Sequence, residues 1–238
     1  MGTQQIVWWK DLGLQRYKPV WDEQERLMQL ATDIKRAEFE QPAAERSTQH
    51  HLLLVEHPPV YTLGKSGHIE NILISEAEMA AQDIDYFKIN RGGDITFHGP
   101  QQLVGYPILD LEKMYTDIGR YLRNLEEVII KTIAHYGLKG ERSAGETGVW
   151  LDPDKPGHER KICAMGVRCS RWITMHGWAL NVNTDLTYFD NIIPCGIVGK
   201  QVTSIAKELG HAIDFEESKQ VLLNKFAEVF EVELRPMG

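Results

Sequence analysis

The sequence has no long apolar run and no surplus of basic residues. No apolar stretch approaches the ~18 residues that a membrane-spanning helix needs, so we predict no membrane segment. The 26 Lys and Arg residues are outnumbered by 34 Asp and Glu residues, and the net charge is −8. This balance argues against a nucleic-acid partner, because neutralising phosphates requires a surplus of positive charge.

Cysteine is also scarce, with only Cys163, Cys169 and Cys195 in the chain. A low, odd number argues against a disulfide framework, and free thiols suit a reducing compartment. The N-terminal residues have no basic start followed by an apolar stretch, so we predict no signal peptide and a cytoplasmic protein. Metal-ligand spacings such as Cys-x-x-Cys or His-Glu-x-x-His are absent, so we expect no metal.

What is present is the pattern of one folded domain, which we predict over residues 1–238. Apolar residues at helical spacing predict helices over 19–38, 117–136 and 214–230. Short apolar runs predict strands over 6–9, 51–55, 60–63, 86–89, 103–111, 148–151, 162–167 and 172–182, with a turn between the second and third. Because strand and helix do not alternate strictly, we predict an α+β fold with a mixed β-sheet flanked by helices.

Residues 91–98 form the segment densest in special residues, Arg-Gly-Gly-Asp-Ile-Thr-Phe-His. Two glycines permit positive φ and let a ligand approach the backbone, but composition alone favours a tight hairpin with Arg91 paired to Asp94. Thr96 and His98 would face the same side of a strand. A lone histidine such as His98 is more often a hydrogen-bonded structural residue than a catalyst.

Cys195 lies between Pro194 and Gly196, which indicates a turn where backbone N–H groups can point at a ligand. The usual free cysteine is a buried, inert thiol, and Cys163 and Cys169, in apolar strand-like segments, fit that description. Lys161 stands at the start of a predicted strand, where a lysine is usually a solvated charge. Spacing alone does not pair Lys161 with Cys195.

Together these segments resemble the lipoyl(octanoyl) transferase family. The similarity covers roughly residues 57–204 and lies in four motifs. These are Arg-Gly-Gly-x-x-Thr-aromatic-His at 91–98 with Gln102 and Tyr106; Arg160-Lys161-Ile162 with Ala164-Met165-Gly166; His176-Gly177 leading to Asn181-Val182-Asn183; and Pro194-Cys195-Gly196. One position departs from the family pattern, because Gln101 stands where a glycine is usual, and this puts the conformation of that turn in question.

The resemblance implies a fold similar to the biotin/lipoate protein ligases, with no cofactor. It implies an acyltransferase that moves an octanoyl group from octanoyl-acyl carrier protein to a lysine of lipoyl domains, in 2-oxoacid dehydrogenases and the glycine cleavage H protein. The implied catalytic residues are Cys195, as the acyl-thioester nucleophile, and Lys161, which lowers the pKa of the thiol and acts as a base. The implied substrate-binding residues are Arg91, Gly92, Gly93, Asp94, Ile95, Thr96, Phe97, His98, Ala164, Met165, Gly166, Gly177, Trp178 and Ala179.

Three further expectations concern the substrate. The oxyanion of the tetrahedral intermediate needs N–H donors, which Gly196 or the Gly92-Gly93 turn could supply. Candidates for an apolar slot are Phe97, Met165, Trp178 and Ile197. Residues 139–171 carry seven Lys and Arg against five Asp and Glu, so we predict a local basic face for an acidic carrier protein.

Other functions remain open at this point. An ATP-dependent lipoate or biotin ligase of the same fold would need no cysteine nucleophile. A non-catalytic module that binds lipoyl domains would form no covalent acyl adduct. A cysteine hydrolase would usually pair its cysteine with a histidine, whereas the resemblance offers Lys161.

Overall fold

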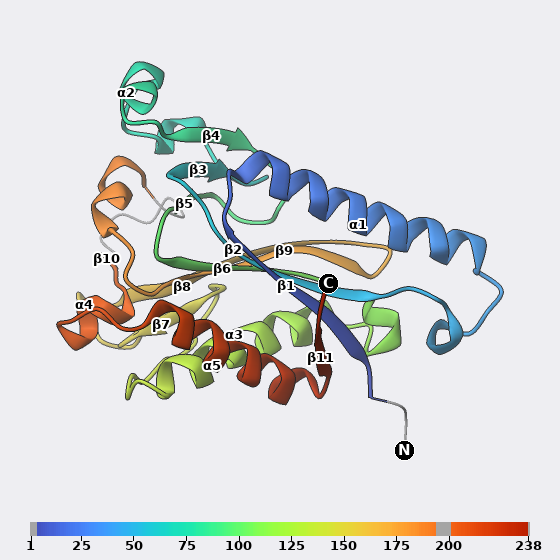
Figure 1. Ribbon diagram of the computed structural model, residues 1–238. Coiled ribbons are helices and arrows are strands. Elements are labelled where there is room, and N and C mark those ends of the chain that lie inside the picture. Colours follow the sequence, from blue (N-terminus) through green and yellow to red (C-terminus); the bar gives the residue numbers. More distant parts are fainter. Residues whose placement is uncertain (1–3, 194–200, 238) are drawn as a thin grey trace.

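The computed structural model describes residues 4–193 and 201–237 and contains a large mixed sheet, a small sheet and helices on both faces (Figure 1). The large sheet has the strand order β10-β8-β9-β6-β2-β1-β11, and β7 pairs with β8. Its strands are β1 Ile6–Leu14, β2 His50–Glu56, β6 Gln102–Ile108, β7 Val149–Leu151, β8 Arg160–Ser170, β9 Ile173–Asn181, β10 Gln201–Val202 and β11 Glu233–Pro236.

The pairing within the large sheet is both parallel and antiparallel. Strand β1 runs parallel to β2 and to β11, and β10 runs parallel to β8. In the centre of the sheet, the pairs β2–β6, β6–β9 and β9–β8 are antiparallel. The predicted α+β plan with a mixed sheet is therefore confirmed.

The small sheet has the order β4-β3-β5, with strands β3 Val60–Leu63, β4 Asp85–Lys88 and β5 Ile95–His98. The short helix α2 (Glu76–Ala81) precedes β4 and lies near this sheet (Figure 1). The turn predicted between β2 and β3 joins strands of different sheets. The central strand β3 separates β4 from β5, so the expected tight hairpin at residues 91–94 is wrong.

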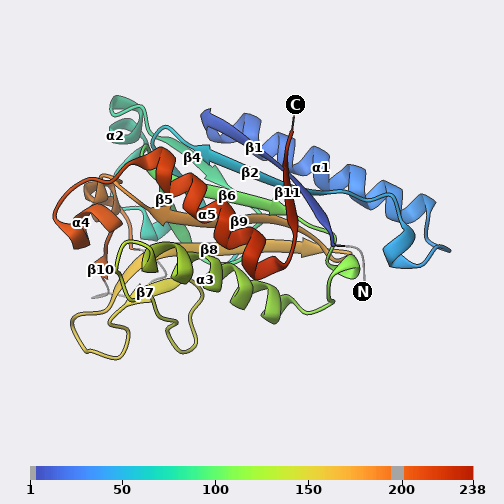
Figure 2. The same ribbon diagram turned by 60° about the horizontal axis from the view of Figure 1, so that its bottom comes forward.

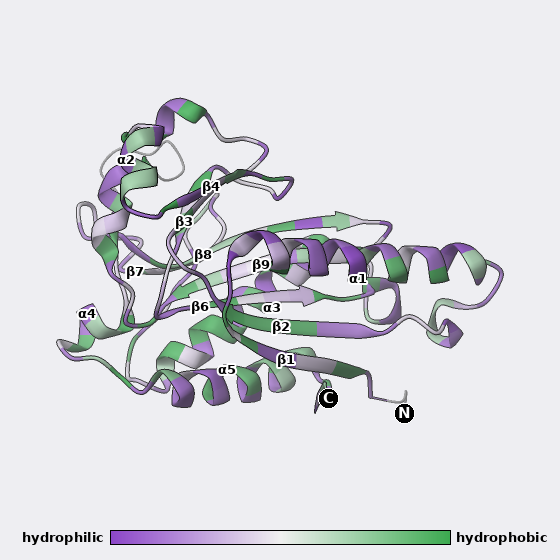
Figure 3. Ribbon diagram, turned by 45° about the horizontal axis from the view of Figure 1, so that its top comes forward, coloured by the Kyte–Doolittle hydropathy of each residue, from purple (hydrophilic) through white to green (hydrophobic). Residues whose placement is uncertain are grey.

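Helix α1 (Tyr17–Ala37) covers one face of the large sheet (Figure 1). Its buried positions include Val20, Leu27 and Ala31, which recur at helical spacing and pack on β6 and β9. Both polar and apolar residues occur along α1 and α5, as in amphipathic surface helices (Figure 3).

Helices α3 (Ile118–Ala134) and α5 (Phe215–Phe230) lie together on the opposite face (Figure 2). Asp117 caps α3 by accepting a hydrogen bond from the N–H of Arg120, and Asp214 caps α5 in the same way. The rings of Phe226 and Phe230 stack at 4.5 Å, and burying each stabilises the fold by roughly 2–3 kcal/mol. The three predicted helices are thus confirmed, with ends shifted by one or two residues.

The remaining elements are short. They are the helix α4 (Ile205–Leu209) and 3-10 turns over Ala43–Glu45, Ile69–Asn71, Leu111–Lys113 and Leu186–Asn191. Among the described residues, no helix has both the length and the apolar character needed to cross a bilayer.

Candidate active site

A cavity of about 410 Å³ opens where β8 and β9 of the large sheet meet the segment between β4 and β5. Every residue predicted to bind substrate lines this cavity, with the exception of Phe97. Elements as distant in sequence as α1, β5, β6, β8 and β9 contribute to its wall, so segments far apart in the chain meet here. Further lining residues include Tyr17, Gln102, Tyr106, Leu122, Glu146, Thr147, Lys161, Val167, His176 and Asn181.

The floor of the cavity is made of small residues on β8 and β9. Ala164 pairs with Ala179 and Gly166 pairs with Gly177 across the two strands. A Cβ on Gly166 would lie 2.7 Å from the carbonyl oxygen of Gly92, so only glycine permits this close approach. The floor is therefore flat and apolar, and leaves room for a slender chain.

Residues 91–94 form a strap over this floor. The N–H of Gly92 donates to the carbonyl of Val167 (3.0 Å), which ties the strap to β8. The Arg91 guanidinium donates to the carbonyl of Thr62 (2.7 Å) and to that of Gly92 (2.9 Å). Asp94 instead accepts from the side chain of Asn71 and its neighbour's N–H, so the expected Arg91–Asp94 pair is wrong.

Histidines and tyrosines lie on another side of the cavity, and His57, His98 and Tyr106 are hydrogen-bonded within the protein. His57 donates from Nδ1 to the carbonyl of Gln15 (2.7 Å) and accepts at Nε2 from the hydroxyl of Tyr106 (2.9 Å). His98 lies between Gln102 (3.0 Å) and the hydroxyl of Thr62 (3.3 Å). Burial lowers the pKa of His57 to about 4 and the pKa of His98 well below its usual range, so both are neutral near pH 7. The interpretation of His98 as a hydrogen-bonded structural residue agrees with these contacts, although His98 also faces the cavity.

Phe97 points away from the cavity. Successive residues of a strand face opposite sides, and Thr96 and His98 occupy the cavity side of β5, as predicted. The Phe97 ring stacks on Tyr188 at 4.6 Å and packs against Phe189 in the core behind the small sheet. The expectation that Phe97 forms the apolar slot is therefore not met, whereas Met165 and Trp178 do line the cavity.

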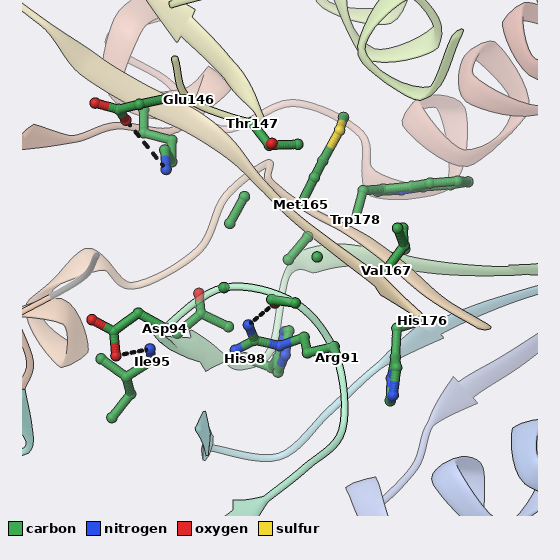
Figure 4. Close-up of a pocket in the computed structure, with 18 of the residues that line it drawn as sticks. Arg91, Asp94, Ile95, His98, Glu146, Thr147, Met165, Val167, His176 and Trp178 are labelled. Atoms are coloured by element: carbon green, nitrogen blue, oxygen red, sulfur yellow. Dashed lines mark hydrogen bonds and ion pairs between the residues drawn. The ribbon is translucent and has the colours of Figure 1, made fainter. Parts of the chain in front are cut away.

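Lys161 lies on the opposite wall, in the second position of β8. Its pairing partner across the strands is Trp150 of β7, and the ammonium lies 4.5 Å from the centre of the indole ring. The nearest carboxylate oxygen of Glu146 is 4.0 Å away (Figure 4). The Lys161 side chain is 13% exposed, so it is not the solvated charge usual at the start of a strand.

The two described cysteines, Cys163 and Cys169, differ in how deeply they are buried. Cys163 is fully buried in the core, and burial raises the pKa of its thiol. Cys169 is partly buried, and burial raises the pKa of its thiol as well. Both therefore stay protonated near pH 7, as inert thiols do. Cys195 lies outside the described residues, together with Pro194, Gly196 and Ile197.

Several residues that line the cavity were not predicted from the sequence. Tyr17 enters from the start of α1, where nothing in the helical pattern distinguishes it. Glu146 and Thr147 come from a loop whose flanking Gly145 and Gly148 both have positive φ. Two glycines three residues apart were the available signal for a tight loop, but they do not reveal what it faces.

His176 adopts φ of +60° within β9, a conformation that is rare for a bulky residue. Its N–H donates to the side chain of the buried Gln24 on α1 (3.0 Å), and its Nε2 donates to Asn90 (3.0 Å). Burial lowers the pKa of His176 to about 3, so its ring is neutral near pH 7. These bonds support the unusual backbone and join β9 to α1 and to Asn90, the residue before the strap.

Gln101 also has a positive φ, of +60°, which explains why a glycine is usual there. Its N–H donates to Glu56 (2.7 Å), and its side-chain oxygen accepts from the amide of Asn183 (2.8 Å). The carbonyl of Gln101 accepts from the hydroxyl of Thr184 (3.0 Å). The turn at this departure from the family pattern is therefore held in the glycine-like conformation by bonds on both sides.

The predicted basic face at residues 139–171 is largely neutralised. Six of its seven positive side chains pair with acidic neighbours, as Arg160 does with Glu208 and Asp152. The other pairs are Lys139–Glu141, Arg142–Glu126, Lys155–Asp152, Lys161–Glu146 and Arg168–Glu25. An attraction for an acidic carrier would therefore have to act against these internal pairs.

Comparison with known proteins decides the family. A model of the lipoyl protein ligase A/B catalytic domain matches residues 28–227. The chain belongs to this family. It is 58% identical to an octanoyltransferase of Christiangramia forsetii over 95% of this chain and 96% of that protein. It is 56% identical to an octanoyltransferase of Flavobacterium johnsoniae over 94% of this chain and 97% of that protein.

The fold is also found among solved structures. A bi-partite lipoate protein ligase from Thermoplasma acidophilum superimposes with a TM-score of 0.66, covering 99% of this chain and 87% of that chain at 16% identity. Such low identity establishes the fold alone. The predicted similarity to the lipoate and biotin ligase fold is confirmed.

Proposed function

We propose that this chain transfers an octanoyl group from octanoyl-acyl carrier protein to a lysine of lipoyl domains, through a thioester on Cys195. The Lys161 ammonium stabilises the Cys195 thiolate, and its neutral amine later accepts a proton from the incoming lysine. The whole of residues 1–238 serves as one acyltransferase domain, and the reaction takes place in the cytoplasm. The acceptors are the lipoyl domains of 2-oxoacid dehydrogenases and the glycine cleavage H protein.

Octanoyl transfer in protein lipoylation is the activity of the family's relatives at more than half identity over nearly the whole chain. The protein is an octanoyltransferase, and hence an acyltransferase, as the sequence motifs predict. Lipoyl domains are the acceptors that this activity implies.

The observation that carries the mechanism is the position of Lys161, whose largely buried side chain lies beside an apolar floor. The floor of Ala164, Gly166, Gly177 and Ala179 suits an unbranched acyl chain, and Met165 and Trp178 add apolar surface. An ammonium beside this floor favours a thiolate nucleophile in contact with it. This placement of a lysine beside an apolar floor supports the proposal of acyl transfer.

In the first half-reaction the Cys195 thiolate attacks the carbonyl carbon of the donor thioester. The tetrahedral oxyanion needs N–H donors, and the N–H of Gly92 is already bonded to Val167. That leaves the N–H groups of Gly93 and Gly196 as candidates. When the bond to the donor sulfur breaks, Lys161 gives that sulfur a proton and becomes neutral.

In the second half-reaction the neutral Lys161 accepts a proton from the nitrogen of the incoming lysine. The new C–N bond forms, the C–S bond to Cys195 breaks, and the thiolate–ammonium pair is restored. Exchange of one thioester for another is nearly balanced in free energy, whereas the amide product is more stable, so the second step drives the reaction forward.

Intact mass tests this proposal. We expect incubation with octanoyl-acyl carrier protein to add one octanoyl group, mapped to Cys195 by peptide analysis. Cys195→Ala should abolish both the adduct and the transfer, while Cys163→Ala and Cys169→Ala should retain both. An adduct on Cys163 or Cys169 would contradict the assignment.

An ATP-dependent ligase shares this fold, and its reaction can be distinguished from the proposed one by the acyl donor. A ligase would lipoylate from the free acid and ATP without a covalent adduct on the protein. Octanoylation of a lipoyl domain from free octanoate and ATP, with no reaction from the carrier thioester, would decide for the ligase.

A further inference from the structure

Glu146 places a carboxylate on the same cavity wall as Lys161. It lies in the loop between α3 and β7, and its side chain is 17% exposed. The loop is held close to β8, because a Cβ on Gly148 would lie 2.5 Å from the carbonyl oxygen of Cys163. The N–H of Gly148 is bonded to the buried Glu126 (3.1 Å). The position of Glu146 is thus determined by the backbone around it.

Among the described residues that line the cavity there is one other carboxylate, Asp94, and its role is different. Asp94 accepts from the side-chain amide of Asn71 (2.7 Å) and from the N–H of Ile95 (2.7 Å), and these bonds shape the strap. Glu146 is instead 4.0 Å from Lys161, a distance that allows charge attraction but exceeds a hydrogen bond. The Glu146 carboxylate is therefore placed beside the group that handles protons.

The acceptor substrate arrives as an ammonium, because a lysine side chain is charged near pH 7. In the acyl-enzyme Lys161 is a neutral amine, so it offers the arriving ammonium no opposite charge. A carboxylate next to Lys161 gives the ammonium such a partner within the cavity.

We infer that Glu146 binds the ε-ammonium of the acceptor lysine and accepts the first of its two protons. This inference rests on the proposed acyl-enzyme mechanism. The ammonium has three N–H bonds and the amide product has one, so two protons must leave. One passes to Glu146 and from there to solvent, and the freed electron pair attacks the thioester carbon. The second passes to Lys161 as the C–S bond breaks and the thiolate leaves.

The role assigned to Glu146 is confined to the second half-reaction. The donor thioester carries no ammonium at its reacting end, so acylation of Cys195 has no need of the carboxylate. A residue that only oriented Lys161 would instead affect both half-reactions, because Lys161 acts in each. This difference separates an acceptor-binding group from a positioning group.

The test is single-turnover kinetics with Glu146→Gln, which retains shape and removes charge. We expect acylation by octanoyl-acyl carrier protein at the rate of the unmodified enzyme. Transfer from the isolated acyl-enzyme to a lipoyl domain should fall about 10²-fold, the usual contribution of a proton acceptor. Glu141→Gln is the matched control, because Glu141 belongs to the same loop but does not line this cavity and pairs with Lys139.

A neutral nucleophile sharpens the test. Hydroxylamine carries no positive charge at pH 7.5 and needs no carboxylate partner, so it should discharge the Glu146→Gln acyl-enzyme as fast as the unmodified acyl-enzyme. Equal slowing of acylation and transfer, or equal slowing toward hydroxylamine and lysine, would overturn the inference. So would transfer to the lipoyl domain at the unmodified rate. Failure of the unmodified enzyme to form any acyl adduct would instead overturn the proposed mechanism.

Discussion

The two walls of the cavity differ in the charge of their polar groups. On the wall of His98 and Tyr106, with His57 bonded behind Tyr106, these groups are neutral and are hydrogen-bonded to protein. On the wall of Lys161 and Glu146, opposite charges face each other at 4.0 Å without a hydrogen bond between them. A neutral, satisfied wall tolerates an apolar acyl chain beside it, whereas charged groups can exchange protons with a substrate.

The largest effect should come from removing the charge on the second wall. Lys161→Ala should slow both half-reactions, overall by about 10²-fold or more, since both a thiolate partner and a base are lost. Lys161→Arg should retain some acylation but fail more severely in transfer, because arginine essentially never gives up a proton. Single-turnover rates of each half-reaction measure this, with iodoacetamide reactivity against pH for the thiol.

Either of two results would count against these roles. If Lys161→Arg transferred octanoate as fast as the unmodified enzyme, the base role would be wrong. If Lys161→Ala left the alkylation profile unchanged, the thiolate role would be wrong too.

Acidification should protonate buried histidines such as His57 and lower the free energy of unfolding. The pKa of His57 is lowered by burial to about 4, whereas an unfolded histidine has a pKa near 6.5. The unfolded chain therefore binds more protons between these values, and the free energy of unfolding falls as pH drops below about 6.5. His57 alone should account for about 2 kcal/mol of the loss between pH 7 and pH 5.

Urea unfolding at the two pH values tests this expectation. His57→Gln should be less stable at pH 7 but less sensitive to acid. His135→Gln serves as the control, because His135 is exposed at the end of α3. An unchanged pH dependence in His57→Gln would show that other groups carry the effect.

A smaller effect on activity should follow from adding a side chain to the floor of the cavity. Gly166→Ala places a Cβ 2.7 Å from the carbonyl oxygen of Gly92, so the strap must lift. We expect the apparent KM for the octanoyl donor to rise about tenfold, equivalent to about 1.4 kcal/mol. Gly119→Ala, on α3 away from the cavity, should leave the KM unchanged, and a normal KM in Gly166→Ala would mean that the strap adapts.

The smallest change should come from Gln101→Gly. Glycine removes the backbone strain that the φ of +60° causes, but it also removes the hydrogen bond that the Gln101 side chain accepts from Asn183. These effects oppose each other, and we expect a change in the free energy of unfolding of less than about 1 kcal/mol. Gln101→Val keeps the strain and loses the bond, so it should be clearly less stable by thermal unfolding. Equal stability of the two variants would contradict this account.

Periodicity predicted the long helices and the central strands, because each buries one regular face. It did not predict β10, β11 or α4, which contain only two to five residues and depend on their neighbours. The motifs placed Arg91, Lys161 and Gly166 at one cavity. They could not place Tyr17 or Glu146, which reach the cavity through tertiary packing, nor show that Phe97 faces away from it.

The bond from the His176 N–H to Gln24 has a consequence for solution measurements. In an antiparallel ladder a strand amide is usually shielded by the neighbouring strand, but this one is shielded by a side chain of α1. Its hydrogen exchange with deuterated water should therefore report the detachment of α1 from the sheet. Comparing its protection with that of the other amides of β9 would reveal whether the helix that carries Tyr17 opens independently of the sheet beneath it.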